Sequence, residues 1–535
     1  MKTFNITGQC IPRKHYMVCI DDKLTEIKKM VDKGNYFVIN RARQYGKTTT
    51  LRILAKHLKE DYVVISLDFQ KMSAAQFKDE CTFAISFSER LLKVIRNRRN
   101  IVAGLSEESL SALQEALGTK HLINLGQLFD YLSELCDTAD KPIVLMIDEV
   151  DSATNNQVFL DFLAQLRAYY IDREDVSTFH SVILAGVYDI KNLKRKISSD
   201  EEHKYNSPKL SQRLYFWNIA ETFDVDMSFS MPEIATMLAD YEADYHTGME
   251  IMTVAEHLHY YTNGYPFLVS SLCKTIHDKC LPWTVNGVDE AEKHVLKSNN
   301  TLFDDIVKNL VNNTSLSKLV ESVLLHGEQV SFEIRNPDIS LGVMLGILVE
   351  KDGQVSISNI LFETQILNYY ISIAQIRGVV GRYVSDTKQR YVSNGRLDMS
   401  EVLERFAAFI HAEYRDEDGL FIERQGRLLF LSFLKPIING TGHYAVEPET
   451  RGSRRMDVVV FYSGEEHIVE LKIWHGEQAA EDAYDQLTGY LESRGQKQGY
   501  LLSFCNNKKS PREGKKFEYK GCVIYEVIVA YRDKE

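Results

Sequence analysis

The sequence predicts a multidomain α/β protein in which short apolar strands alternate with helices. With 535 residues, the chain is too long for one hydrophobic core and suggests roughly three or four domains of about 100–200 residues each. A hydrophobic content of 44% beside 26% charged residues and only 10 prolines is typical of a chain that is folded over most of its length. Continuously apolar segments of strand length recur between helical patterns, which favours sheets covered by helices on both faces.

The net charge and the cysteine content limit the partners and the cellular compartment that we expect for this protein. The formal net charge of −12 excludes a protein that coats nucleic acid through its overall charge, so contacts with nucleic acid must come from local basic patches. The eight cysteines show no CxxC pair and no histidine at zinc-ligand spacing, which predicts reduced structural thiols. The first residues lack the apolar stretch of a signal peptide, and no run approaches the ~18 apolar residues of a membrane helix. We therefore expect a cytoplasmic protein without a membrane partner.

The first domain is expected over residues 1–228. Helical stretches such as NLGQLFDYLSELCD separate its apolar segments. Short, continuously apolar strands between helices predict a parallel sheet of the α/β nucleotide-binding type. The expected strands lie at residues 36–40, 62–69, 142–151 and 180–189.

A phosphate-binding pattern follows the first of these strands. The segment RARQYGKT matches GxxxxGK[ST] at Gly46, Lys47 and Thr48, with Arg41 in place of the first glycine. It opens a helix, where backbone N–H groups and the helix dipole favour phosphate. Lys47 would reach the β- and γ-phosphates of ATP, and Thr48 would place its hydroxyl on Mg²⁺. For the motif taken alone, a chance GKT at a helix start is the alternative.

An acidic pair at the end of the third strand supports the nucleotide interpretation. The run IVLMI leads directly into Asp148 and Glu149, which is the order expected of a Walker B strand. Asp148 would hold Mg²⁺ and Glu149 would orient or deprotonate the attacking water. Two acids at a strand end can also be solvated turn residues. For Asp151, the next acid, a role as the N-cap of a helix is at least as well supported as a catalytic role.

The middle of the chain is predicted to be mostly helical. Apolar residues at i, i+3 and i+4 spacing predict a helical lid over residues 229–290. Within it, Gly264 and Pro266 begin a helix, either as an ordinary first turn or as the turn that lies near adenine in STAND-type ATPases. Helices followed by a hairpin at Asp352-Gly353 predict a winged helix over residues 291–375. A helical, charge-mixed connector is expected over residues 376–418.

Residues 419–535 return to a mixed α/β pattern and carry a second candidate site. Asp457 opens the strand DVVVFY, and a second strand contains Glu470-Leu471-Lys472. Two carboxylates on adjacent strands, Asp457 and Glu470, can share one Mg²⁺. Strand alternation puts Glu470 and Lys472 on one face, where the lysine can help to activate water. Taken alone, an ExK pattern on a strand more often lies on a solvent-exposed face without a catalytic role.

Three neighbouring features favour a metal-dependent nuclease site over a solvent-exposed strand face. The helix EDAYDQLTGYLES presents Gln486 and Tyr490 on one face. The turn RGSRR and the loop NNKKSPREGKK supply local positive charge for a phosphate backbone. Glu447 is a third acid one strand upstream, and its alternative is a surface residue of an edge strand.

The chain resembles bacterial AAA-ATPase-like proteins, frequent in gut Bacteroidetes, that carry a C-terminal domain of the PD-(D/E)XK nuclease superfamily. In the first part of the chain, the resemblance is seen in the segments RARQYGKTTTL, VLMIDEVD, ILAGVYDIKNLK and NGYPFLV. Those in the last part are FLSFLKPIINGTGHYAVEPE, RRMDVVV, VELKIWHG and DQLTGYL. The resemblance implies a P-loop module of AAA or STAND type, a winged helix and a restriction-endonuclease-like α/β domain. Its nuclease core would comprise Asp457, Glu470, Lys472, Gln486 and Tyr490.

The leading hypothesis from the sequence is an ATP-dependent or ATP-gated, Mg²⁺-dependent nuclease that acts on DNA. RNA stays open as the substrate, as do endonuclease or exonuclease action and a homo-oligomeric state. The competing hypothesis is a STAND-like nucleotide-switch signalling protein whose C-terminal domain binds nucleic acid without cleaving it. Two acids and a lysine in metal-cleaving order favour the enzyme, because a binding domain does not need them.

Overall fold

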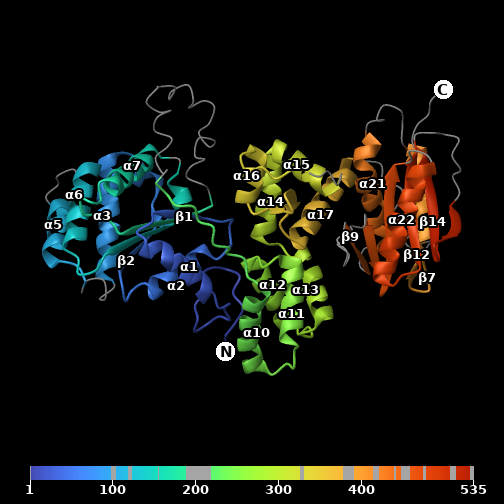
Figure 1. Ribbon diagram of the computed structural model, residues 1–535, viewed down its shortest axis with the longest axis horizontal. Helices are drawn as coiled ribbons and strands as arrows, with labels where there is room; N and C mark the ends of the chain where they lie inside the picture. Colours follow the sequence, from blue (N-terminus) through green and yellow to red (C-terminus); the bar gives the residue numbers. More distant parts are fainter. Residues whose placement is uncertain are drawn as a thin grey trace. The chain divides into compact units, whose positions relative to one another are not determined.

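The structure is a computed structural model (Figure 1). It forms two compact units, of which the first comprises Met1–Asp304, Glu333–Val349 and Ser358–Leu361 and the second comprises Asp305–Phe332, Glu350–Ile357 and Phe362–Glu535. Within the described part of the chain, no helix is long and apolar enough to cross a bilayer. The described residues are 2–97, 104–118, 123–154, 156–187, 219–325, 330–377, 391–413, 421–438, 441–446, 458–473, 477–505 and 514–530.

The first unit is built on a parallel sheet of four strands in the order β1-β4-β3-β2. All of its strand pairs are parallel, so the carboxyl ends of the strands meet at one edge of the sheet. Each strand lies within a segment that the apolar runs predict. The strands are β1 (Phe37–Asn40), β2 (Val63–Asp68), β3 (Ile143–Asp148) and β4 (Ser181–Gly186).

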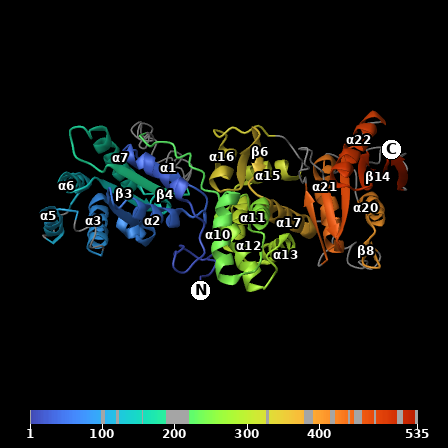
Figure 2. The same cartoon turned by 60° about the horizontal axis from the view of Figure 1, so that its bottom comes forward.

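Helices cover both faces of this sheet (Figure 2). On one face, α3, α5, α6 and α7 share a continuous apolar core with alternate residues of the strands, Val63, Ile65 and Leu67 of β2 among them. On the other face, α1 and α2 pack together. The helices are α1 (Asp21–Asp32), α2 (Lys47–His57), α3 (Glu80–Arg96), α5 (Glu107–Gly118), α6 (Leu125–Asp137) and α7 (Gln157–Ile171), with short 3-10 turns η1 (Phe69–Lys71), η2 (Ala74–Phe77) and η3 (Val150–Ser152).

Four helices follow where the sequence predicts a lid. Ser230 caps the first one in a capping box with Glu233, which satisfies free N–H groups at the helix start. Gly264 precedes the third helix with φ of +70°, and a Cβ at this position would lie 2.1 Å from the carbonyl oxygen of Phe229. Only glycine fits this close approach. The helices are α10 (Met231–Tyr245), α11 (Ile251–Thr262), α12 (Pro266–Asp278) and α13 (Val285–Lys297).

Helices and a hairpin occupy the region predicted as a winged helix. The hairpin turns at Asp352 and Gly353, both with positive φ, as a tight two-residue turn requires. The boundary between the two compact units runs through these elements, and the five domain ranges predicted from the sequence stay a prediction. The elements are α14 (Thr301–Asn312), α15 (Thr314–Leu325), α16 (Pro337–Met344), β5 (Leu348–Lys351), β6 (Gln354–Ile357) and α17 (Ile360–Arg377).

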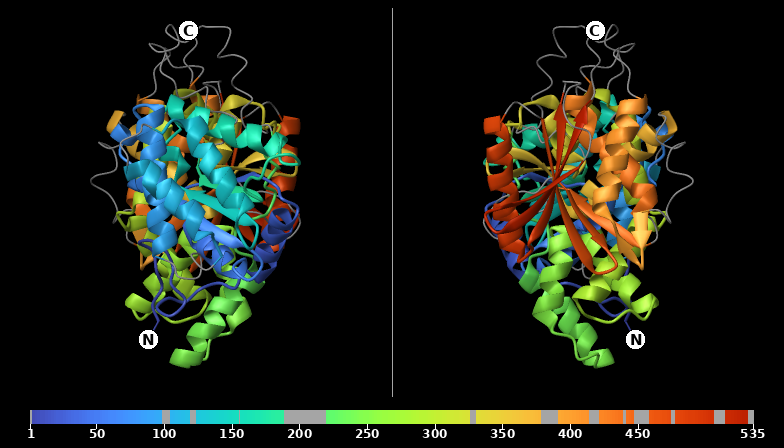
Figure 3. Two further views of the ribbon diagram at one scale, coloured as in Figure 1. Left: turned by 90° about the vertical axis from the view of Figure 1, so that its left-hand side faces the viewer. Right: turned by 90° about the vertical axis from the view of Figure 1, so that its right-hand side faces the viewer.

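The second unit contains a six-stranded mixed sheet in the order β13-β14-β12-β11-β10-β9 (Figure 3). Its centre, β11-β12-β14, is parallel, and the outer pairs are antiparallel. The last two strands, β13 and β14, were not among the strands expected from the sequence. The strands are β9 (Gly442–Val446), β10 (Val458–Tyr462), β11 (Glu465–Ile473), β12 (Gln498–Cys505), β13 (Lys515–Tyr519) and β14 (Cys522–Ala530).

Helices cover both faces of the second sheet as well. The helix α22 (Glu477–Arg494) shares one apolar core with β11, β12 and β14. On the other face, α20 (Met399–Glu413) packs against β14 and α21 (Phe421–Ile438) against β9 and β12. A short hairpin, β7 (Val392–Ser393) and β8 (Arg396–Leu397), precedes α20. Part of the segment expected to be a connector is therefore a layer of the C-terminal fold.

Candidate functional site

The loop between β1 and α2 contains the predicted phosphate-binding residues. Gln44 and Gly46 both adopt positive φ, so the chain turns sharply before α2 begins at Lys47. The Lys47 side chain is 8% exposed, and its ammonium donates hydrogen bonds to the carbonyl oxygens of Arg41 and Ala42, at 2.9 and 3.0 Å. The loop thus wraps around the lysine at the N-terminus of a helix, where an anion is favoured.

Arg41 replaces the first glycine of the motif, and its side chain contacts other parts of the chain than Lys47 does. Its guanidinium donates to the carbonyl oxygens of Asn40 at 3.0 Å and Val225 at 2.8 Å, and it lies over the ring of Phe223. Burial lowers the pKa of Arg41. The side chain therefore ties the loop to the segment after β4.

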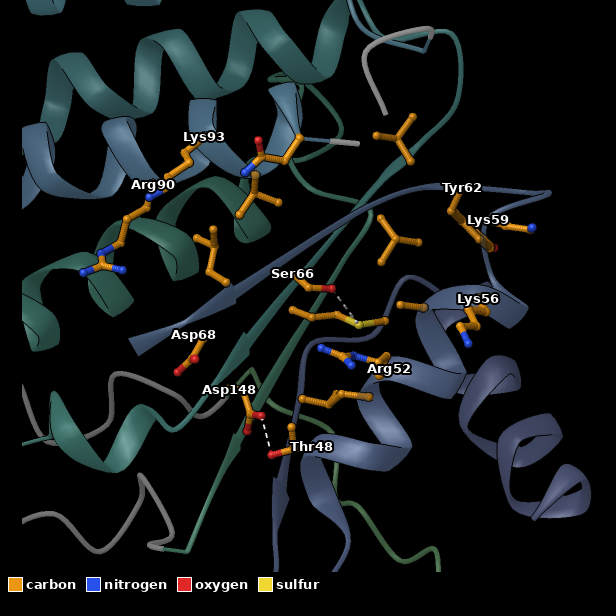
Figure 4. A pocket seen from close by; sticks show the side chains of 18 of the residues that line it. Thr48, Arg52, Lys56, Lys59, Tyr62, Ser66, Asp68, Arg90, Lys93 and Asp148 are labelled. Atoms are coloured by element: carbon orange, nitrogen blue, oxygen red, sulfur yellow. Dashed lines mark hydrogen bonds between the residues drawn. The ribbon is translucent and has the colours of Figure 1, made fainter. Parts of the chain in front are cut away.

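The two predicted magnesium ligands of this site meet. The Thr48 hydroxyl donates a 2.6 Å hydrogen bond to Oδ2 of Asp148 (Figure 4). Asp148 ends β3 and is paired in register with Asp68, which ends β2. The two acids, Asp148 and Asp68, therefore lie with the Thr48 hydroxyl of α2 at the carboxyl edge of the sheet. The sequence reasoning missed Asp68, although an acid directly after the apolar run VVISL was a usable signal.

Glu149 follows Asp148 in an unusual conformation. Its φ of 56° lies in the left-handed region, which non-glycine residues rarely adopt and which often marks functional sites. Burial raises the pKa of Glu149, and the neighbouring carboxylate of Asp148 raises it further. A raised pKa makes this carboxylate a better proton acceptor near neutral pH.

Burial and nearby carboxylates act in opposite directions on the pKa of Lys47. Burial lowers the pKa of Lys47, and the carboxylates of Asp151, Glu149 and Asp148 act in the opposite direction. Asp151 also has a packing role, because its Oδ2 accepts a 2.6 Å hydrogen bond from the backbone N–H of Val187 at the end of β4. It is thus a tie between two strand ends, a role that neither sequence interpretation of Asp151 anticipated.

One lid residue reaches the phosphate-binding loop. Tyr265 lies between the Gly264 and Pro266 of the predicted turn, and its hydroxyl donates a 2.5 Å hydrogen bond to the carbonyl oxygen of Arg43. Its ring meets that of Tyr45 edge-on, with centroids 4.6 Å apart. The turn therefore connects α12 to the loop that holds Lys47. The sequence pointed to this turn, but not to the tyrosine within it.

In the second unit, Glu470 and Lys472 lie on β11. The Glu470 side chain is 1% exposed, and its Oε1 lies 3.0 Å from Nζ of Lys472, whose side chain is 37% exposed. A buried carboxylate is thus paired with a cation that reaches toward solvent. Asp457, predicted as the other metal-binding acid, and Glu447 lie outside the described residues.

Gln486 and Tyr490 lie one turn apart on α22. The Gln486 amide donates a 2.5 Å hydrogen bond to the Tyr490 hydroxyl. Tyr490 packs with Ile468 of β11 and Leu501 of β12 in the core under α22. Because Ile468 and Glu470 are two residues apart on a strand, Glu470 points to this same face. The structure therefore brings Glu470, Lys472 and the glutamine–tyrosine pair to one side of the sheet.

A second buried acid on this face was missed. Glu526 on β14 is in register with Leu501, which is in register with Glu470. Its carboxylate accepts hydrogen bonds from the hydroxyls of Tyr484, at 2.8 Å, and Ser503, at 3.1 Å. A glutamate inside the apolar run CVIYEVIVA was the available signal, because a buried acid in a strand needs a partner.

The described residues fit Mg²⁺ only together with a phosphate ligand. Among them, no group of three or more His, Cys, Asp or Glu side chains is arranged to hold a metal ion. In proteins, Mg²⁺ usually keeps several waters and binds one or two carboxylates together with substrate phosphates. Thr48 with Asp148 in the first unit, and Glu470 in the second, supply oxygen donors of that kind.

Three comparisons with known proteins bear on the fold and family of the chain. A family model described as an AAA-like domain matches residues 15–368. The search of curated proteins found no match. A Walker-type ATPase of Pyrococcus abyssi is 13% identical, with a TM-score of 0.45 over 68% of this chain and 99% of that one. The ORC2 protein of Aeropyrum pernix is also 13% identical, with a TM-score of 0.35 over 70% and 96%.

Proposed function

The chain belongs to the AAA-like domain family, and from this premise we propose that its first unit binds ATP with Mg²⁺ and hydrolyses it. The observation that carries the proposal is the 2.6 Å hydrogen bond between Thr48 and Asp148, which joins the start of α2 to the end of β3. These are the two side chains that a P-loop ATPase uses to hold Mg²⁺. When bound, Mg²⁺ supplies positive charge beside the phosphates.

The proposed roles follow from the surroundings of each residue. Lys47 contacts the β- and γ-phosphates, because its ammonium is held at the start of α2 by carbonyl oxygens of the loop. Glu149, whose pKa is raised by burial, accepts the proton of the attacking water. Backbone N–H groups at the start of α2 donate to phosphate oxygens.

The test separates binding from hydrolysis. Glu149→Gln removes the proton acceptor and keeps the shape, so we expect ATP binding within about twofold of wild type and hydrolysis slower by about 100-fold. ATP binding is measured by titration calorimetry and hydrolysis by phosphate release. Glu26→Gln, on the exposed side of α1, is the matched control. Hydrolysis at the wild-type rate in Glu149→Gln would remove the assigned role.

We further propose that the second unit is a Mg²⁺-dependent nuclease that cleaves DNA phosphodiesters. The supporting observation is the buried Glu470 with Lys472 at 3.0 Å, on the sheet face that also carries Gln486 and Tyr490. Glu470 would bind the metal, and Lys472 would orient the attacking water and stabilise charge on the phosphate. The resemblance assigns Asp457 as the second acid.

Cleavage of linear, circular and branched DNA with and without Mg²⁺ tests this proposal, and single-stranded RNA is the comparison substrate. We expect Glu470→Gln to reduce cleavage by about 100-fold or more. Glu518→Gln, exposed on β13, is the matched control. Cleavage that survives in Glu470→Gln would assign the activity to another site or to a contaminant.

A nucleotide switch is the second candidate, and the contact of Tyr265 with Arg43 favours it. A lid residue that binds the loop carbonyl can transmit the state of the nucleotide to the lid. If the wild type hydrolyses ATP but cuts no nucleic acid under any nucleotide condition, the second unit is a binding module and the protein is a STAND-like switch. Lys47→Ala with and without ATP shows whether nucleotide gates either function.

A further inference from the structure

A groove runs along the outer edge of the first sheet. Its cavity of about 1270 Å³ begins at Thr48 and Asp148 and extends beside β2 to Tyr62. Figure 4 shows α2 on one side of β2 and α3 on the other, with charged side chains from both. Since β2 is the last strand in the sheet order, the floor of the groove is an open strand edge.

The backbone of β2 presents hydrogen-bonding groups to this groove. The Val63 N–H donates to the carbonyl oxygen of Pro142 next to β3, and β2 pairs with β3 in parallel register. Because backbone groups alternate in direction along a strand, the N–H and C=O groups of Val64 and Ser66 point away from β3. Within the described part of the sheet, β3 is the partner strand of β2. These groups can accept one more strand.

Basic side chains dominate both rims. The acids of the lining are Asp68 and Asp148, at the nucleotide end, and Glu60. Lys71 pairs with Asp68 at 2.9 Å, and it alone of the basic lining residues has an ion-pair partner among the described residues. In a protein with a net charge of −12, this is a local basic patch. Its other members are Arg52, Lys56, Lys59, Arg90, Lys93 and Lys141.

The walls below these rims are apolar. Leu51 and Ala55 line the α2 side, and Val94 lines the α3 side. Side chains of a strand added to β2 would point alternately toward α2 and toward α3. Each set would meet apolar atoms near the floor and cations above them. The chemistry that fits is an extended segment with acidic and small apolar residues.

We propose that this groove binds an extended acidic segment of a partner protein, which adds as a strand to the edge of β2. Two independent observations carry the proposal: the open backbone groups of Val64 and Ser66, and the basic rims. A single-stranded nucleic acid could use the basic rims, but it has no peptide backbone to pair with β2. Its binding also depends on aromatic side chains on which the bases stack. Tyr62 is the aromatic residue of the lining, and its ring already stacks on His180.

The test uses a fluorescein-labelled peptide of alternating glutamate and valine, as long as β2, in fluorescence anisotropy with the full chain. We expect saturable binding, and at least about tenfold weaker binding to the double variant Lys56→Glu/Lys93→Glu. Lys29→Glu/Lys274→Glu, at exposed or half-exposed positions outside the groove, should bind as the wild type does. Circular dichroism melting of both variants checks that they fold.

Two further arms identify the mode of binding. N-methylation of alternate peptide amides should weaken binding by about tenfold, because it removes the donors of one strand edge. Hydrogen exchange of residues 62–68 should slow when the unmodified peptide binds. Equal binding of the N-methylated peptide, or of a lysine–valine peptide, would overturn the proposal. Tighter binding of single-stranded oligothymidylate that displaces the peptide would overturn it in favour of nucleic acid.

Discussion

Lys47 and Lys472 belong to the two candidate sites, and their surroundings differ. Lys47 is almost buried, yet its ammonium is held by two carbonyl oxygens of its own loop. Lys472 is partly exposed, and its ammonium lies 3.0 Å from the buried carboxylate of Glu470. Among the described residues, no carboxylate forms an ion pair with Lys47, whereas Lys472 pairs with a buried acid.

This difference indicates two kinds of site. A buried ammonium held by neutral oxygens is available to a phosphate, because the ligand brings the missing negative charge. A carboxylate with its own lysine is stable without a ligand. Glu292 on α13 represents a third case: it is 8% exposed and has no ion-pair partner among the described residues. Substitutions that remove each of these charges in turn test the comparison.

Removing the unneutralised charge should have the largest effect. Lys47→Met keeps much of the side-chain volume and deletes the ammonium, so we expect kcat/KM for ATP to fall by about 1000-fold, or about 4 kcal/mol. Steady-state phosphate release measures this. Lys29→Met, at an exposed position of α1, is the control. Hydrolysis within about tenfold of wild type would show that the carbonyl-held lysine is structural.

The unpaired acid Glu292 should make stability depend on pH. Burial, with a further contribution from Asp289 and against the effect of Lys293, raises its pKa from 4.5 to about 7. Folding therefore favours the neutral form. Its stabilising contribution is complete below pH 4.5 and is lost as the pH rises through about 7, a change of about 3 kcal/mol. In Glu292→Gln this loss should be absent.

Urea unfolding between pH 4.5 and 8 tests the Glu292 prediction. Trp283 lies two residues before α13 and packs against Tyr241. Its fluorescence therefore reports on this region when Trp217 and Trp474 are replaced by Phe. The difference between wild type and Glu292→Gln isolates the one carboxyl. Parallel pH profiles in the two proteins would mean that Glu292 ionises normally.

Breaking the neutralised pair should have a smaller effect. Lys472→Met leaves the buried carboxylate of Glu470 without its cation, and because Lys472 is partly exposed we expect a loss of about 2 kcal/mol in the opening free energy of β11. Hydrogen exchange of residues 465–473 measures it. Glu470→Gln/Lys472→Met should recover most of the loss. Lys520→Met removes the exposed pair with Asp485 and should change nothing measurable.

Local sequence signals predicted the four strands of the first sheet and which residues meet at their carboxyl ends. Continuous apolar runs identified the four strands of the first sheet, because a parallel strand is buried on both faces. The meeting of Thr48 with Asp148 follows from the same pattern, since the carboxyl ends of parallel strands share an edge. The tight turn at Asp352-Gly353 also has a local cause, namely the positive φ that both positions need.

Contacts between distant segments could not be predicted in this way. Arg41 looked like a defect in the phosphate-binding motif, and only its contacts with Phe223 and Val225 show how it replaces glycine. The helix α20 looked like a connector because its charges are mixed, yet it packs against β14. No periodicity within one segment encodes a partner more than a hundred residues away.

The smallest predicted effect tests whether the lid helps to hold the loop around Lys47. Tyr265→Phe deletes one hydrogen bond to the carbonyl oxygen of Arg43 and keeps the ring contact with Tyr45. A neutral hydrogen bond contributes about 1 kcal/mol, so the Kd for ATP should rise about fivefold while kcat stays unchanged. Titration calorimetry gives the Kd, and Tyr260→Phe, 53% exposed on α11, is the control. An unchanged Kd would mean that the loop keeps its shape around Lys47 without this contact from the lid.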